Sequence, residues 1–412
     1  MATPVSPSHT TRVPSTFAIL ARTPRIFAFA GVFTVGGAAI GAKEVARWQY
    51  MQESAGGPWG IGIAAVIIAL ATAAVGFAVG RVVDRRDPRP YLLAVLVSSA
   101  ALCVITAHFL NAGPLPLLQA WVTAALDGAI LGMAGPSLVK IQAAIVGSAA
   151  AGSAEILNIL RLGVGGVVGA VLAGISPSPK VTLVVVAGAL LVAAILLLVV
   201  LRPVGHDRIT AATRSTVSLV AVLRNDAGLR RVVIVDLALS LVIPTQLVNL
   251  VVSSRDLPQL ASLAIASGMA GLLVGRLLLF WRGFRDNARV VLFITTGTVA
   301  GTQLIGAVLL VDDWLLRSTA AIVVIIGVAS VMCAYSVGFT AAVIQKGVPE
   351  EARGKLAGVL VAGRSVLIAA AALASTAIAA ALGATGILLV LASALILLIV
   401  LSRGFRGVTT LS

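Results

Sequence analysis

The chain has 412 residues, of which 59% are hydrophobic and 11% are charged, and its formal net charge is +15. Soluble domains are about a quarter charged, so this composition excludes an ordinary soluble protein. The basic residues lie in short segments between apolar runs rather than on one domain. Membrane topology therefore explains the positive charge better than binding to nucleic acid does.

Residues 1–25 are polar, and we expect a cytoplasmic N-terminal tail there. Twelve apolar runs follow, each long enough to cross a bilayer as a helix that satisfies its own backbone hydrogen bonds. We predict an all-α membrane protein with twelve transmembrane helices in two pseudo-symmetric six-helix bundles. The bundles would comprise residues 26–202 and 231–402, with a cytoplasmic linker at 203–230, which includes a short amphipathic helix, and a cytoplasmic tail at 403–412. The predicted spans are 26–48, 58–80, 90–110, 115–139, 154–176, 180–202, 231–253, 258–281, 289–311, 316–345, 354–381 and 385–402.

Orientation follows from the distribution of Lys and Arg. With both termini inside, the inner segments hold 23 of the 30 basic residues and the outer segments hold five. An excess of Lys and Arg marks cytoplasmic loops, so both termini are predicted to be cytoplasmic. Strong preference for Arg over Lys, with abundant Ala, Gly and Val, is typical of a GC-rich bacterium, which indicates the bacterial inner membrane.

Three charged residues lie one turn apart near the outer end of the first span: Lys43, Glu44 and Arg47. Glu44 and Arg47 are spaced i,i+3, as in a helical ion pair. An interfacial ion pair explains them, and an external gate is the alternative. We also include Glu44 among the candidate proton-coupling residues.

Residues 80–89, between the second and third spans, contain four Arg and two Asp, which a bilayer interior does not accept. A fragment of this charged turn, Gly80-Arg81, returns 195 residues later as Gly275-Arg276. A recurrence at about half the chain length is typical of secondary transporters built from two related halves.

Asp127 lies near the middle of the fourth span, where an ionisable residue is costly and is a functional candidate by default. We predict that it couples transport to protons and contacts substrate. The alternative is a structural ion pair with Arg161 in the neighbouring fifth span.

Arg161 and Arg364 occupy similar places in the fifth and eleventh spans, and we predict that both face a central cavity and contact an anionic substrate. A salt bridge, a carbonyl contact or extension of the side chain to the cytoplasm is the alternative for each. Asp236, about one turn inside the seventh span, is expected to reach the membrane interface and is a further proton-coupling candidate.

The loop pattern Gly80-x-x-x-Asp84-Arg85 resembles the signature of the major facilitator superfamily, and its loop sequence is most similar to that of bacterial drug and siderophore exporters. Residues 271–276, 345–354 and 161–169 resemble, respectively, the repeat of this loop, the loop between spans ten and eleven, and a glycine-rich fifth span. The chain departs from the family pattern at Ala124, where proton-driven exporters have Arg, at Leu279, where the second loop has Asp, and in the absence of Pro from the glycine run.

The resemblance implies that Gly80, Arg81, Asp84 and Arg85 form a gate, with Asp84 facing the N-terminus of the eleventh span, where the helix dipole favours a carboxylate. It also implies a secondary transporter that exports a small amphipathic molecule with protons as coupling ions. Import of a small organic anion is one alternative, and a membrane scaffold without transport is another. The sequence has no phosphate-binding loop with Lys, no catalytic constellation and no metal-ligand spacing, so we expect no enzyme activity and no cofactor.

Overall fold

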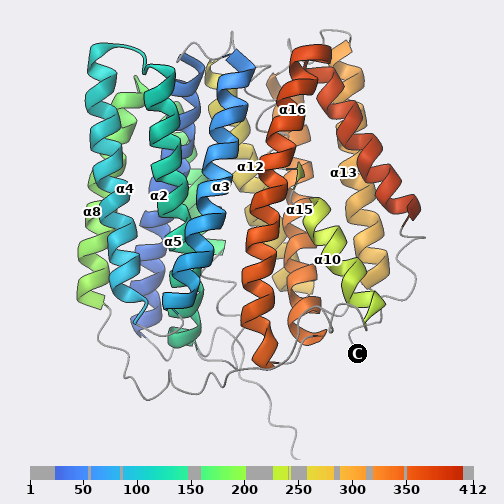
Figure 1. Cartoon of the computed structure of the whole chain (residues 1–412), viewed down its shortest axis with the longest axis horizontal. Helices are drawn as coiled ribbons and strands as arrows, with labels where there is room; N and C mark the ends of the chain where they lie inside the picture. Colours follow the sequence, from blue (N-terminus) through green and yellow to red (C-terminus); the bar gives the residue numbers. More distant parts are fainter. Residues whose placement is uncertain are drawn as a thin grey trace, which may run out of the picture.

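A computed structural model describes residues 24–53, 57–83, 87–146, 159–200, 226–239, 241–242, 258–282, 288–311, 319–347 and 350–401. All of the elements in these ranges are helical (Figure 1). Within the described residues, nine helices are long and apolar enough to cross a membrane. Large apolar side chains face outward, for example Ile195 and Val199 at 61% and 75% exposure, as expected for a surface in contact with lipid. The chain is therefore a multi-pass membrane protein.

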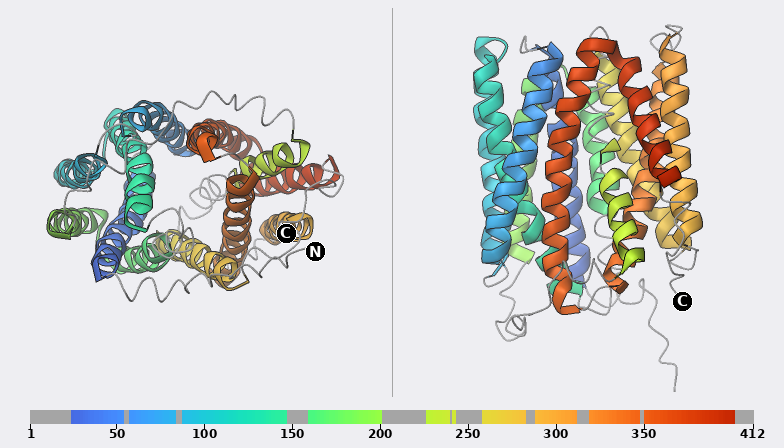
Figure 2. Two further views of the ribbon diagram at one scale, coloured as in Figure 1. Left: turned by 90° about the horizontal axis from the view of Figure 1, so that it is seen from below. Right: turned by 45° about the vertical axis from the view of Figure 1, so that its right-hand side comes forward.

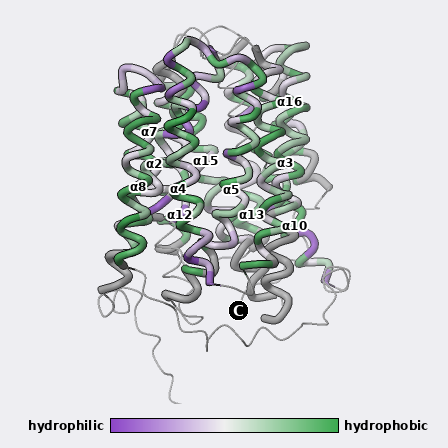
Figure 3. Tube along the Cα trace, turned by 60° about the vertical axis from the view of Figure 1, so that its left-hand side comes forward, coloured by the Kyte–Doolittle hydropathy of each residue, from purple (hydrophilic) through white to green (hydrophobic). Residues whose placement is uncertain are grey.

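The first half of the chain forms long helices that run alternately up and down in Figure 1. Hydrophobic residues predominate along the helices in Figure 3, with hydrophilic residues near the ends and at a few places within the bundle, which suits helices that cross a bilayer. The elements are α2 (Pro24–Glu53), α3 (Gly57–Val83), α4 (Arg89–Phe109), η1 (Leu110–Ala112), α5 (Leu117–Val146), a π-helical segment η2 (Ile159–Gly165) that continues as α7 (Gly166–Gly174), and α8 (Pro179–Val200).

The second half contains α10 (Ala227–Leu239), α12 (Pro258–Arg282), α13 (Ala288–Val311), α15 (Thr319–Gly347) and α16 (Glu350–Leu401). The last two predicted spans, 354–381 and 385–402, belong to one helical element that reverses direction at Gly383 (Figure 1). Gly383 has φ of 70°, a left-handed conformation that glycine adopts without steric cost. The seventh span begins four residues earlier than predicted, and the amphipathic linker helix lies outside the described residues.

Close glycine contacts join corresponding helix pairs in the two halves, α3 with α5 and α12 with α15. A Cβ on Gly132 would lie 2.7 Å from the carbonyl oxygen of Thr72, and one on Gly271 would lie 2.5 Å from that of Gly327. Each pair also has one interhelical hydroxyl bond. These are Thr72 Oγ1 to Gly128 O at 3.0 Å and Ser267 Oγ to Val323 O at 2.6 Å. The donors of these two bonds are 195 residues apart, and so are the acceptors. This is the spacing of the sequence repeat, so the repeat also appears in the helix packing.

The two halves meet along two seams, one between α3 and α16 and the other between η2–α7 and α12 (Figure 2). In the first seam, a Cβ on Gly62 would lie 1.8 Å from Oγ1 of Thr376. In the second, one on Gly174 would lie 2.9 Å from Cβ of Ser262. Both contacts lie toward the end of the molecule that carries η1, so the halves are in close contact at that end.

Candidate functional site

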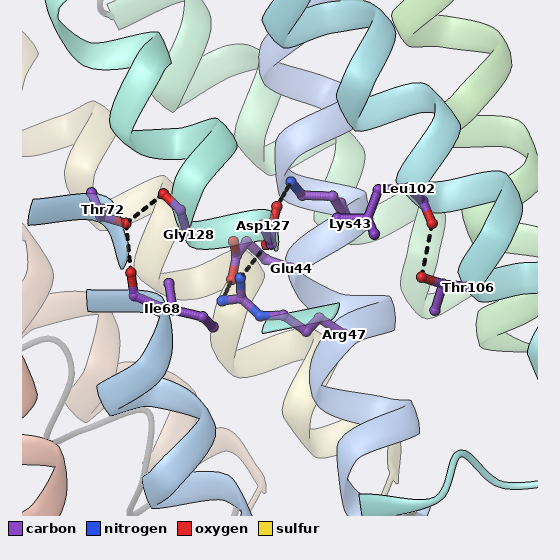
Figure 4. Close-up of polar contacts among 9 residues, drawn as sticks. All are labelled: Lys43, Glu44, Arg47, Ile68, Thr72, Leu102, Thr106, Asp127 and Gly128. Carbon is purple, nitrogen blue, oxygen red and sulfur yellow. Dashed lines mark hydrogen bonds and ion pairs between the residues drawn. The ribbon is translucent and has the colours of Figure 1, made fainter. Parts of the chain in front are cut away.

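Four charged residues gather between α2 and α5, and we call them the α2–α5 charge cluster: Lys43, Glu44, Arg47 and Asp127. The Lys43 ammonium donates to Oδ1 of Asp127, and Arg47 Nη1 donates to Oδ2 at 2.8 Å (Figure 4). The Nη2 of Arg47 donates to Glu44. Lys43, Arg47 and Asp127 are between 4% and 7% exposed, so the cluster is buried within the protein.

Helical spacing explains this arrangement. Lys43 and Arg47 are four residues apart and lie on one face of α2, from which both reach the same carboxylate. Asp127 lies ten residues into α5, about 15 Å along the axis from the end that carries η1. The predicted Glu44–Arg47 pair is confirmed. Arg47 also binds Asp127 on the neighbouring α5, so this pair lies inside the protein rather than on its surface.

The helices around the cluster are tied together by further polar contacts. Tyr50 hydrogen-bonds Thr123. The Thr72 hydroxyl lies 2.7 Å from Ile68 O and 3.0 Å from Gly128 O, so its single proton is shared between these two acceptors (Figure 4). Two carboxylates balance two cations in the cluster. A buried set of this kind stays balanced only while every member is present, since loss of one partner leaves an uncompensated charge.

A second group lies in the other half and consists of Asp236 on α10, Thr340 on α15 and Arg364 on α16; we call it the α10–α16 charge cluster. Arg364 binds Asp236 through two nitrogens, with Nε to Oδ2 at 2.9 Å and Nη2 to Oδ1 at 2.6 Å. The Thr340 hydroxyl donates to Asp236 Oδ1 at 2.7 Å. Asp236 is completely buried, so the expectation that it reaches the membrane interface is wrong. Its position is set by two neighbouring helices that supply hydrogen-bond donors.

The two clusters lie toward opposite ends of the molecule. Asp236 is nine residues into α10, or about 14 Å from the end opposite η1. Sequence reasoning identified both charged members of this second cluster but did not pair them, and it missed Thr340. A single threonine in an apolar span gives no signal by itself, because its hydroxyl can bond to its own helix backbone.

Arg161 belongs to neither cluster. Its guanidinium carbon lies 5.8 Å from the ring centroid of Phe33 on α2, and its Nε is buried without a hydrogen-bond partner. The alternative pairing of Arg161 with Asp127 is wrong, because both Asp127 oxygens accept from Lys43 and Arg47. Within the described residues, no carboxylate forms an ion pair with Arg161.

The predicted gate falls largely outside the described part of the chain. Asp84 and Arg85 lie outside it, as does the Arg81 side chain, and their gating role stays a prediction. Gly80 lies near the end of α3, where a Cβ would lie 3.8 Å from Cγ of Pro136. Beyond the gap, Asp87 binds Arg89 Nε at 2.9 Å, which holds the start of α4.

No family model and no curated protein matches the sequence. Among solved structures, a variant of the nucleoside transporter NupG matches with a TM-score of 0.66 at 14% identity, covering 93% of this chain and 100% of that one. NupG itself matches with a TM-score of 0.63, at the same identity and coverage. The variant E. coli fucose:proton symporter FucP matches with a TM-score of 0.59 at 14% identity, covering 92% and 98%. These likenesses show that the chain has the fold of these transporters.

Proposed function

We propose that this protein is a secondary active transporter that moves a small molecule across a bacterial inner membrane without changing it chemically. Two six-helix bundles, residues 26–202 and 231–402, would rock about a central site to give alternating access, with both termini in the cytoplasm. The fold likeness and the two seams between the halves support this proposal.

The observation that carries the proposal is the buried charge cluster between α2 and α5. Charges at membrane depth are costly, and in membrane proteins they mark substrate paths and proton relays. Asp127 holds two cations at once. Protonation of its carboxylate would weaken both contacts together, which gives a proton a direct effect on how α2 and α5 are joined. We therefore assign proton coupling first to Asp127, then to Asp236 and Glu44.

For the direction of transport we propose export of a small amphipathic molecule in exchange for protons, on the loop sequence at residues 80–89. Import of a small organic anion is the second candidate, and Arg161, whose buried Nε has no hydrogen-bond partner, favours it. The fold by itself does not select between them, because it also serves FucP, a fucose:proton symporter.

The test compares small molecules inside and outside cells that express the wild type, Asp127→Asn or no transporter. We expect one class of compound to differ between wild-type and empty cells, and this difference to disappear in Asp127→Asn. The identified compound is then followed in proteoliposomes under an imposed pH difference, where direction is read from the side on which it accumulates.

Asp226→Asn is the matched control. This variant also removes one carboxylate. Asp226 lies at the start of α10, where its side chain accepts a hydrogen bond from the amide of Leu229 at 2.9 Å. Asn caps helices as well as Asp does, so the helix should be preserved. Asp226→Asn should retain full transport. Accumulation against a gradient by Asp127→Asn at the wild-type rate would refute the proton-coupling role, and no metabolite difference for any variant would refute transport.

A further inference from the structure

Each half has one arginine that contacts a residue on the first helix of that half, but the contact residue differs between the halves. Arg364 on α16 lies against Asp236 on α10, and Arg161 on η2 lies against Phe33 on α2. In both pairs the arginine follows its contact residue by 128 residues. The pairs therefore have the same register between corresponding helices, with a carboxylate in one half and an aromatic ring in the other.

Helices of both halves pack against η2 close to Arg161. A Cβ on Gly37 would lie 1.9 Å from the Arg161 carbonyl oxygen, so α2 and η2 are in backbone contact beside the side chain. The other side of η2 contacts α12 across the seam between the halves, where a Cβ on Gly163 would meet Leu273 at 2.6 Å. η2 is also π-helical, a distortion often found at functional sites.

The ring of Phe33 attracts a cation but does not satisfy the hydrogen-bond donors of a guanidinium. Phe33 itself is 3% exposed and packs on Phe29 with ring centroids 4.4 Å apart, so it is fixed in place. A planar fork of donors fits a carboxylate through two parallel bonds, as Arg364 does with Asp236.

We infer that Arg161 binds the carboxylate group of the transported molecule, so that the substrate is a small organic carboxylate. This inference rests on the proposed function and makes it more specific. The Arg364–Asp236 pair shows the expected geometry. The substrate carboxylate would bind Arg161 as the Asp236 carboxylate binds Arg364. Arg364 is neutralised within the protein, and its predicted contact with substrate is replaced by this structural role.

The test measures binding separately from transport, with purified protein in nanodiscs of phosphatidylcholine. Acetate, benzoate and succinate are the probes, and acetamide, benzamide and succinamide are their neutral counterparts. Melting temperature is followed with a thiol-reactive dye, since Cys103 and Cys333 are both buried and react on unfolding. We expect at least one carboxylate, and none of the amides, to raise the melting temperature in a saturable manner.

Three variants locate the effect. Arg161→Gln should weaken the apparent affinity for the carboxylate at least tenfold, while Lys180→Gln, which removes an exposed cation at the start of α8, should leave it unchanged. Phe33→Asp should supply an internal carboxylate as Asp236 does, and so should abolish the response to added carboxylate. Phe33→Asn, which removes the same ring but places a neutral amide there, should retain the response to added carboxylate that Phe33→Asp loses.

An unchanged carboxylate response in Arg161→Gln would overturn the inference, as would the absence of a response to all three carboxylates in the wild type. Stabilisation through Arg161 by nanodiscs of phosphatidylglycerol, with none by soluble carboxylates, would identify a lipid site and also overturn it. Binding without flux would leave this inference standing and refute the proposed function. Flux of a neutral or cationic compound without carboxylate binding would refute this inference and leave the proposed transport function standing.

Discussion

Each charge cluster contains a buried aspartate, and the two aspartates are stabilised by different sets of partners. In the first half, Asp127 binds two cations that come from one helix, α2. In the second half, Asp236 binds one cation and one hydroxyl that come from two helices, α16 and α15. The first cluster concentrates four charged side chains at a single helix pair, while the second distributes two charged side chains and one hydroxyl over three helices.

This difference decides what each aspartate stabilises. Neutralising Asp127 leaves Lys43 and Arg47 facing each other in the interior, with only Glu44 to balance them. Neutralising Asp236 leaves one cation, Arg364, whose side chain is 28% exposed and has access to solvent or headgroups. We therefore expect the first half to respond more strongly to changes in charge than the second.

The largest effect is expected for Asp127→Asn. Two buried cations lose their shared partner, and removal of one member of a buried ion pair costs about 3–5 kcal/mol. The melting temperature in detergent, followed by reaction of the buried cysteines with a thiol-reactive dye, should fall strongly. Replacing Lys43 with Met in the same chain should recover part of the loss, because it removes one of the two unbalanced charges. Equal stability of Asp127→Asn and the wild type would show that the cluster is not a structural link.

A smaller effect is expected for Asp236→Asn, since an amide oxygen still accepts from Thr340 and Arg364 is partly exposed. Loss of hydrogen bonds to a charged group costs about 1.5–3 kcal/mol. The same assay measures the fall in melting temperature. A smaller fall for Asp236→Asn than for Asp127→Asn would support the view that the first half is more sensitive to changes in charge. A larger fall would mean that contacts distributed over three helices matter more than the number of charges.

Thr340→Val should cost less again, about 0.5–1.5 kcal/mol, because it removes one hydroxyl donor and preserves the shape of the side chain. Arg364 keeps both of its bonds to Asp236 in this variant. Thr340→Ser is the control and should retain most of the stability, since it retains the donor. If Val and Ser behave alike, the hydroxyl bond contributes nothing measurable to this cluster.

The smallest effect on stability is expected for Asp84→Asn, which changes a charge in the loop rather than in the interior. Its predicted consequence is a shift between conformations, read from the accessibility of single cysteines placed at Val164 and Ala362 in a chain that lacks Cys103 and Cys333. The melting temperature should stay near that of the wild type. Unchanged accessibility together with full transport would remove the gating role of this loop.

Several elements could be predicted from the sequence because they depend on local properties. Apolar runs of about 20 residues specified the spans, and the Gly80-Arg81 repeat indicated the related halves. The ends of α3 and α13 agree with prediction within a few residues. The predicted spans 354–381 and 385–402 also left a break at residues 382–384, where the structure has Gly383 at φ of 70°.

The sequence by itself determined that this chain spans a membrane many times and which ionisable residues lie in its spans, because both follow from hydropathy and the cost of charge in lipid. Only the tertiary structure decided which charges meet. Asp127 could reach cations on several neighbouring helices, and rotation and tilt of α2 against α5 selected Lys43 and Arg47 rather than Arg161. The same applies to Asp236. Its place in the sequence, near the start of a span, predicted an interfacial side chain, but residues of α15 and α16 bind and bury it. Packing fixes the rotation of each helix, and a single sequence does not specify that rotation when the apolar residues surround the helix on all sides.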